Sequence, residues 1–134
     1  MQINTSQVQI SNNDLLIDAY LAQPEGNDKK GAVIDFQEIF GVNNNIRDIT
    51  ELIALQGYIA IAPALYQRVA PGFEFGFSAE DAGFSQEAYR LGLEYYQQVK
   101  YQEIFSDIKA TIAYLKTLAN VKADSIGCIG FCFG

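Results

Sequence analysis

Residues 124–134, DSIGCIGFCFG, determine how we interpret the rest of the chain. Their first part is a short apolar run of the length of a buried strand, and GFCFG follows at once. A turn of the form G-x-nucleophile-x-G directly after a strand lifts the central side chain above the carboxyl end of that strand, and the amide after it can face an oxyanion. Cys132 is therefore a candidate nucleophile and the Phe133 amide a candidate oxyanion donor. The same spacing also fits a Cys132 that is only a small buried side chain.

Upstream of this stretch, strand and helix patterns alternate. Residues 32–36 and 58–62 are apolar runs of strand length, and between them Ile46, Ile49, Leu52 and Ile53 recur at helical spacing before Gly57. This strand–helix–strand order is typical of a parallel crossover unit.

Further elements are expected on either side of the crossover unit. Two strand patterns around the turn Asn12–Asp14 predict an N-terminal hairpin. Residues 63–84 read as a long irregular loop, and residues 85–99 and 101–119 as helices. In the second helix, one stripe is formed by Ile104, Ile108, Ile112 and Leu115. The fold class is therefore α/β, a mostly parallel sheet with an antiparallel hairpin at its N-terminus.

Composition limits the possible function classes. The 134 residues carry a formal net charge of −7 and are 49% hydrophobic, which indicates one globular domain. An acidic chain is poorly suited to nucleic acid or to an anionic membrane surface. We recognise neither a membrane-spanning run nor a secretory signal, and expect a cytoplasmic protein.

The sequence contains no histidine and only two cysteines, Cys128 and Cys132. These residues cannot build a zinc site of the usual cysteine or cysteine–histidine kinds. We interpret Cys128, in the middle of the last strand, as a buried core residue. A redox pair of the two cysteines is therefore a weak alternative.

Several stretches resemble the dienelactone hydrolase family of the α/β-hydrolase superfamily. The most specific are residues 37–43, QEIFGVN, and the GFCFG run; IRD at 46–48, QGY at 56–58 and APALYQR at 62–68 also match. The resemblance extends from about Val8 to Gly134, but covers only the N-terminal part of the family's domain. We therefore expect residues 1–134 to form a single partial α/β-hydrolase domain that ends within the nucleophile turn.

The resemblance implies a role for particular residues. Cys132 would be the nucleophile, with Glu38 contacting its thiol and helping to form the thiolate. The amides of Ile39 and Phe133 would form the oxyanion hole, and Tyr89 would line the pocket. The reaction implied is hydrolysis of a small ester or lactone, without a cofactor. A carboxylate such as Glu38 can accept a thiol proton only if burial raises its proton affinity.

Two departures from the family pattern affect the interpretation. Ser85 stands where enzymes specific for dienelactone carry an arginine, so a neutral ester or lactone is as good a candidate substrate. We interpret the nearby Arg68 and Arg90 as surface charges. The family's triad Asp and His lie downstream of the nucleophile, and these 134 residues hold no His. We expect the chain alone to be inactive, with an exposed edge at its last strand. The alternative is a non-catalytic domain that requires a partner or the rest of its chain.

Overall fold

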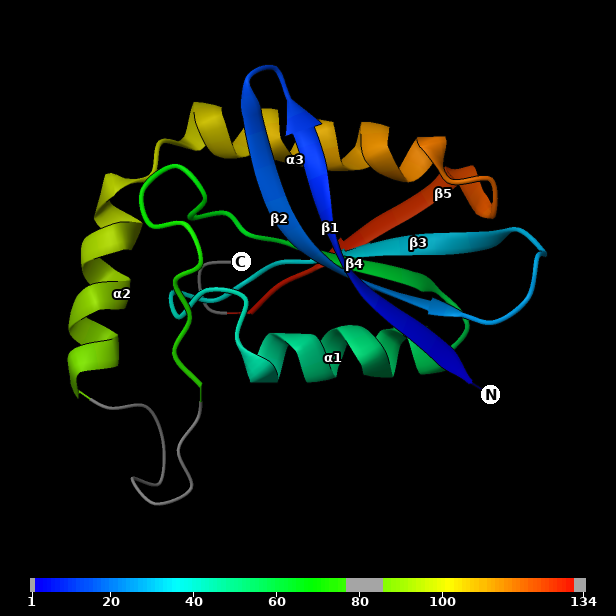
Figure 1. Cartoon of the computed structure of the whole chain (residues 1–134), viewed down its shortest axis with the longest axis horizontal. Coiled ribbons are helices and arrows are strands. Elements are labelled where there is room, and N and C mark those ends of the chain that lie inside the picture. The colour runs from blue at the N-terminus through cyan, green and yellow to red at the C-terminus, as the bar shows by residue number, and fades with distance from the viewer. Residues whose placement is uncertain (1, 77–85, 132–134) are drawn as a thin grey trace.

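A five-stranded mixed sheet forms the centre of the molecule, with helices on both faces (Figure 1). The computed structural model describes residues 2–76 and 86–131. In chain order, the elements are β1 (Ile3–Asn12), β2 (Leu15–Pro24), β3 (Lys30–Asp35), α1 (Asn44–Leu55), β4 (Ile59–Pro63), α2 (Gln86–Gln98), α3 (Tyr101–Thr117) and β5 (Val121–Ile129). Every strand and helix predicted from the sequence is present.

The sheet order is β1-β2-β4-β3-β5. β4, β3 and β5 are parallel to one another, and α1 makes the crossover between β3 and β4. The predicted hairpin of β1 and β2 is confirmed, with Asn13 at φ 56° in its turn. Because β2 also pairs antiparallel with β4, the sheet is mixed and its parallel part is limited to three strands.

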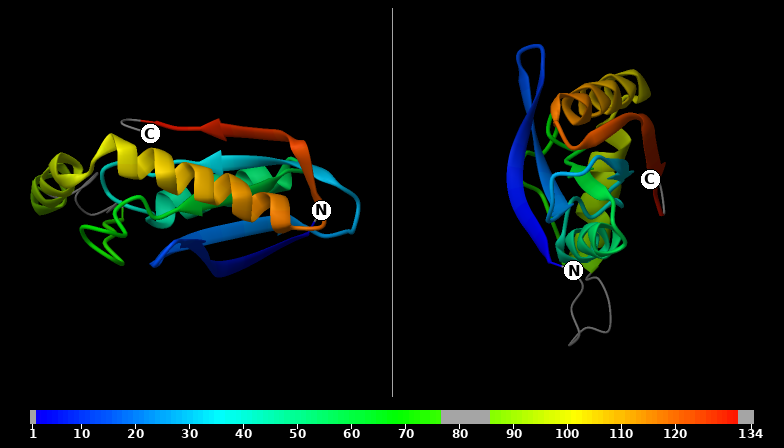
Figure 2. Two further views of the ribbon diagram at one scale, coloured as in Figure 1. Left: turned by 90° about the horizontal axis from the view of Figure 1, so that it is seen from above. Right: turned by 90° about the vertical axis from the view of Figure 1, so that its right-hand side faces the viewer.

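The two faces of the sheet are covered by α1 and α3 (Figure 2). On the α3 face, Leu115 packs with buried strand residues such as Ile17, Ile34 and Ile61. The predicted stripe of α3 is only partly correct. Ile104 and Leu115 are buried, but Asp107 and Thr111 are the buried residues between them, and Ile108 and Ile112 are half-buried. The reason is that Asp107 takes part in a polar network described below.

In the described part of the chain, β5 is an edge strand, as expected for a sheet that ends at this point. It contacts the core through Val121 and Ile126, whereas Ile129 and Phe131 are exposed. Cys128 is also exposed, so the prediction that it is a buried core residue is wrong. The physical reason is that β5 has a paired neighbour, β3, on one side only.

Candidate active site

The carboxyl ends of β3 and β5 lie side by side. Asp35 is in register with Ile129, and the Phe36 amide donates to the Ile129 carbonyl at 2.9 Å. The turn that contains Glu38 and the residues that follow β5 therefore start from neighbouring points on one sheet edge, where open α/β sheets bind ligands. Cys132 and Phe133, the predicted nucleophile and oxyanion donor, lie outside the described residues, and so does Ser85.

The Glu38 turn is fixed by hydrogen bonds and by a glycine. The buried Gln37 side chain accepts a hydrogen bond from the Leu65 amide at 2.7 Å and donates one to the Glu38 carbonyl at 3.2 Å. Gly41 has φ +80°, and a Cβ there would lie 2.2 Å from the Phe73 carbonyl oxygen. Gln37 and Gly41 thus hold the turn against the loop after β4. The sequence analysis assigned neither of them a role, although both belong to the QEIFGVN motif.

The predicted pocket residues gather around this turn. Glu38 is half-buried, whereas Ile39 and Phe40 are buried. Tyr89 reaches the turn from α2 and meets Phe40 edge to face, with ring centroids 5.2 Å apart. Half of Tyr89 remains exposed, so its ring forms part of the surface next to the turn. The structure thus brings Glu38, Ile39 and Tyr89 into one region.

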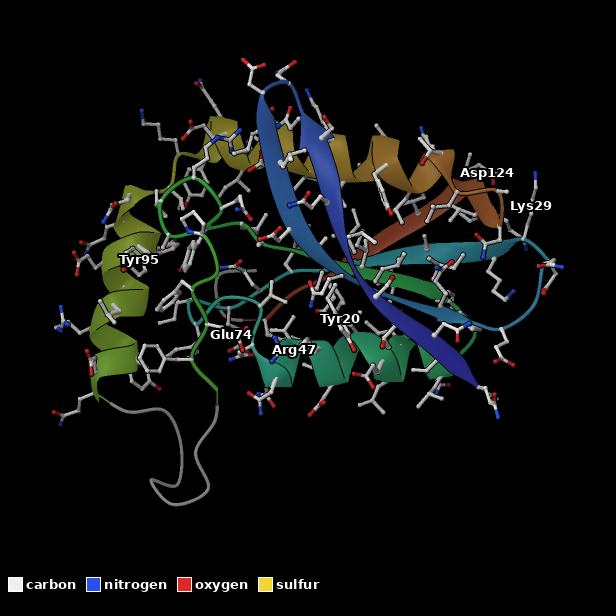
Figure 3. All side chains as sticks on the ribbon, in the orientation of Figure 1. Tyr20, Lys29, Arg47, Glu74, Tyr95 and Asp124 are labelled. Carbon is white, nitrogen blue, oxygen red and sulfur yellow. The ribbon has the colours of Figure 1, made fainter. Side chains whose placement is uncertain are left out.

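Helix α2 approaches this turn through small residues, of which Ala88 is fully buried. A Cβ at Gly92 would lie only 2.8 Å from the Ile39 carbonyl oxygen, so only glycine permits the present spacing. The Tyr66 hydroxyl donates to the Gly92 carbonyl at 3.3 Å, and Tyr95 packs on Phe73 at 4.8 Å (Figure 3). α2 is therefore a support for the Ile39 backbone. The role of Gly92 could not be predicted from the sequence, because a glycine inside a helix gives no functional signal by itself.

The start of α1 supports the opposite side of the turn. Asn43 caps the helix by accepting from the Ile46 amide at 3.0 Å, and its amide group donates to the Phe75 carbonyl at 2.7 Å. Arg47 forms a two-point ion pair with Glu74 (Figure 3), and this hydrogen bonding raises the pKa of Arg47. An open cavity of about 230 Å³ lies here, lined by residues including Tyr20, Arg47, Phe73 and Glu74. Because Glu74 neutralises Arg47, the described residues that line this cavity offer no unpaired cation to an anionic substrate.

Two aspartates that the sequence analysis did not single out are buried, Asp35 at 0% and Asp107 at 1% exposure. Asp35 Oδ2 lies 2.9 Å from Thr50 Oγ1, and Asp35 Oδ1 has no hydrogen-bond partner among the described residues. Burial, reinforced by the negative charge of Glu38, raises the pKa of Asp35 to about 6. The position of Asp35 inside the apolar run 32–36 was the feature of the sequence that could have revealed a buried carboxylate.

Asp107 is paired with Arg68 and accepts from the Asn12 amide group at 2.8 Å. Arg68 is exposed, as expected, but its guanidinium also neutralises a buried carboxylate, which the sequence did not reveal. Arg90 is exposed, as expected, and pairs with Glu87 and Glu94 along its own helix.

Within residues 2–76 and 86–131, no three acidic, cysteine or histidine side chains are grouped as metal ligands would be. None of the helices described here is long and apolar enough to span a membrane.

Comparisons with known proteins agree with this geometry. A sequence model of the dienelactone hydrolase family matches residues 17–134. A relative from Synechocystis sp., provisionally named a carboxymethylenebutenolidase, is 49% identical over 134 residues, which are all of this chain and 52% of the relative. The carboxymethylenebutenolidase of Pseudomonas sp. strain P51 is 33% identical over 98 residues, 73% of this chain and 38% of that protein.

A solved structure from Klebsiella pneumoniae, provisionally assigned as a dienelactone hydrolase, superimposes with a TM-score of 0.80 at 26% identity. The superposition covers all of this chain and 52% of that one. The chain thus spans about half the length of the relatives it matches. Its fold is that of the α/β-hydrolases, and the chain belongs to the dienelactone hydrolase family.

Proposed function

We propose that this chain forms the nucleophile-bearing part of a cysteine hydrolase that cleaves a small ester or lactone. The observation that carries the proposal is the side-by-side ending of β3 and β5, which starts the Glu38 turn and the GFCFG run from one sheet edge. The family match supports the hydrolase class. Cys132, Glu38, Ile39, Phe133 and Tyr89 are the residues to which we assign its chemistry.

In the proposed reaction, the Cys132 thiol passes its proton to Glu38 and the thiolate attacks the carbonyl carbon. The amides of Ile39 and Phe133 stabilise the negative charge that develops on the carbonyl oxygen. The C–O bond to the leaving group breaks as the leaving oxygen takes up the proton held by Glu38, which leaves an acyl-thioester on Cys132. Water then hydrolyses the thioester, which releases the acid and restores the Cys132 thiol. The 134 residues contain no histidine, so a histidine base for the water must come from outside them.

The substrate class is part of the proposal, because the fold does not determine it. The relative from Pseudomonas sp. strain P51 is named for action on a carboxymethylenebutenolide. For this chain, a neutral ester or lactone is equally eligible, because Ser85 replaces the arginine that the resemblance associates with the dienelactone carboxylate. Arg68 and Arg90 offer no substitute at the turn, because each is paired with carboxylates elsewhere.

The test uses a fusion protein in which residues 1–134 are joined to the part of the Synechocystis relative that lies C-terminal to the aligned region. Hydrolysis of dienelactone and of a neutral p-nitrophenyl ester is measured for the fusion, for its Cys132→Ala and Cys128→Ala variants, and for residues 1–134 alone. We expect turnover that is lost with Cys132→Ala, retained with Cys128→Ala and absent from residues 1–134 alone. Turnover by a folded Cys132→Ala variant would refute the nucleophile assignment.

A further inference from the structure

A buried acid group between β3 and α1 is not used in the proposed reaction. Asp35 closes β3 and is fully buried, and Thr50, which faces it from α1, is fully buried as well. An ionised carboxylate in such a place normally has a cation or several hydrogen-bond donors. Here, Oδ1 of Asp35 has no partner in the described part of the chain, and the only donor near Oδ2 is a single hydroxyl.

The hydrogen bonding around Thr50 indicates where a proton must lie. Thr50 Oγ1 carries one proton but lies within hydrogen-bond distance of two acceptors, Asp35 Oδ2 at 2.9 Å and the Ile46 carbonyl oxygen at 2.7 Å. One hydroxyl proton cannot serve both acceptors fully. If Asp35 Oδ2 is protonated, it donates to Thr50 Oγ1, and Thr50 donates to Ile46. Both short contacts are then proper hydrogen bonds.

The charges around Asp35 also favour the neutral acid. The charge that acts on it from its own turn is the negative charge of Glu38. On α1, Arg47 is paired with Glu74, and Glu51 accepts a hydrogen bond from Tyr20. β4 is IAIAP and contains no ionisable side chain, and the charged residues of β5 lie near its start, far along the strand from Ile129, the register partner of Asp35.

We propose that Asp35 is a neutral, protonated acid in the folded protein at mildly acidic pH, and that its ionisation loosens the joint between β3 and α1. Burial raises the pKa of Asp35 to about 6, in the direction that this proposal requires, whereas a hydrogen bond from Thr50 to the ionised carboxylate acts to lower it. Because the folded-state pKa lies above the ordinary 3.8, the contribution of Asp35 to stability is present at low pH and is lost as pH rises through about 6. The contact between the end of β3 and α1 is therefore sensitive to pH, and it lies directly before the Glu38 turn. The proposal does not depend on the proposed hydrolase activity.

The test is made on the fusion protein, as wild type, Asp35→Asn and the matched control Asp48→Asn, which changes an exposed aspartate of α1, the helix that carries Thr50. Melting temperatures are measured from pH 4.5 to 8, together with a ¹³C NMR titration of the aspartate side-chain carboxyls. We expect one carboxyl, absent from the Asp35→Asn spectrum, to titrate near pH 6. We also expect Asp35→Asn to melt about 5 °C above wild type at pH 8 but not at pH 5.

Two results would overturn the proposal. One is an Asp35 carboxyl that titrates near pH 4 in the wild-type protein. This measurement does not depend on whether any variant folds. The other is an Asp35→Asn variant with the same dependence of melting temperature on pH as Asp48→Asn. Hydrogen exchange, corrected for the intrinsic effect of pH on the exchange rate, tests the contact between β3 and α1. In wild type, the amides of α1 around Thr50 should exchange faster at pH 8 than at pH 5 after this correction. In Asp35→Asn, their corrected rates should be the same at both pH values. Equal exchange in the wild type would refute the loosening.

Discussion

Two aspartates in the described part of the chain are buried in opposite ways. Asp107, on α3, has a guanidinium and an amide group as partners, and it connects α3 to the hairpin through Asn12 and to the loop after β4 through Arg68. Asp35, at the end of β3, has one shared hydroxyl and an oxygen without a partner among the described residues. Buried charge that is fully paired holds elements together, whereas an unpaired buried acid is tolerated only where it can take up a proton.

The difference also separates two regions of the chain. The Asp107 region connects α3, the hairpin and the loop after β4 by side chains. The turn after β3 is held by the Gln37 side chain and by close backbone contacts at Gly41 and Gly92, next to the residues to which we assign chemistry. Mutations in the two regions should therefore have different consequences. The following predictions are for the fusion protein.

The largest effect is expected from Asp107→Val. The substitution leaves Arg68 and Asn12 without their buried partner, and breaking such a pair costs about 3 kcal/mol, at the lower end of the usual range because Arg68 is partly exposed. Urea unfolding measures the loss. The matched control, Arg90→Ala, removes only exposed ion pairs and should cost less than about 0.5 kcal/mol. If Asp107→Val lowers the free energy of unfolding as little as Arg90→Ala does, the polar network around Asp107 does not stabilise the fold.

In the Glu38 turn, the effect should fall on activity instead. Glu38→Gln cannot accept the thiol proton, and we expect acylation by a p-nitrophenyl ester to slow by about 100-fold while unfolding stays close to that of wild type. Stopped-flow release of p-nitrophenol measures the acylation rate. Glu87→Gln, an exposed carboxylate on α2, is the control and should change nothing. An unaltered acylation rate in Glu38→Gln would mean that another group activates the thiol.

A single methyl group tests the backbone support of Ile39. In Gly92→Ala, the new Cβ would lie 2.8 Å from the Ile39 carbonyl oxygen, so the turn or the helix must shift. We expect kcat to fall by about tenfold, with a smaller change in KM, because an oxyanion donor acts mainly in the transition state. Leu93→Ala, at an exposed position of the same helix, serves as the reference. Equal kcat values for the two variants would count against Ile39 as the donor.

The smallest predicted effect is a gain in stability, opposite in sign to the loss expected from Asp107→Val. Asp35→Val removes a buried acid whose partner among the described residues is one shared hydroxyl, and Thr50 keeps Ile46 as its acceptor. The folded-state pKa of Asp35 is raised to about 6, so the cost of its charge is felt above that pH. We expect Asp35→Val to stabilise the protein by about 1 kcal/mol at pH 8 and to show no gain at pH 5. Urea unfolding at both pH values measures this, and destabilisation at pH 8 would remove the contrast with Asp107.

Much of the fold could be predicted from the sequence because strand and helix patterns were local and clear. The hairpin, the crossover unit and both later helices follow from apolar spacing and from turn residues such as Gly57. What the spacing could not show was pairing: β2 joins β4, and β5 has one neighbour, so the mixed sheet and the exposed Cys128 depend on contacts distant in sequence. For the same reason, the polar face of α3 at Asp107 went unrecognised, because its partner Arg68 lies 39 residues away.

For the candidate site, the roles of the residues stay predictions. The structure shows that Tyr89 packs against Phe40, in the turn that carries Glu38 and Ile39. The supports of that region, Gln37, Gly41 and Gly92, depend on distances to the backbone of the loop after β4 and of Ile39 itself, which no sequence pattern reports.

The claim at the centre of this interpretation is that Cys132 carries the acyl group. The most direct measurement is mass spectrometry of the fusion protein quenched in acid during turnover of a slowly hydrolysed p-nitrophenyl ester, followed by peptide mapping. We predict one acyl group per protein, on the peptide that contains Cys132, released by hydroxylamine as a thioester would be, and absent from Cys132→Ala. An acyl group on a serine, or on Cys128, with an unmodified Cys132 would contradict the claim.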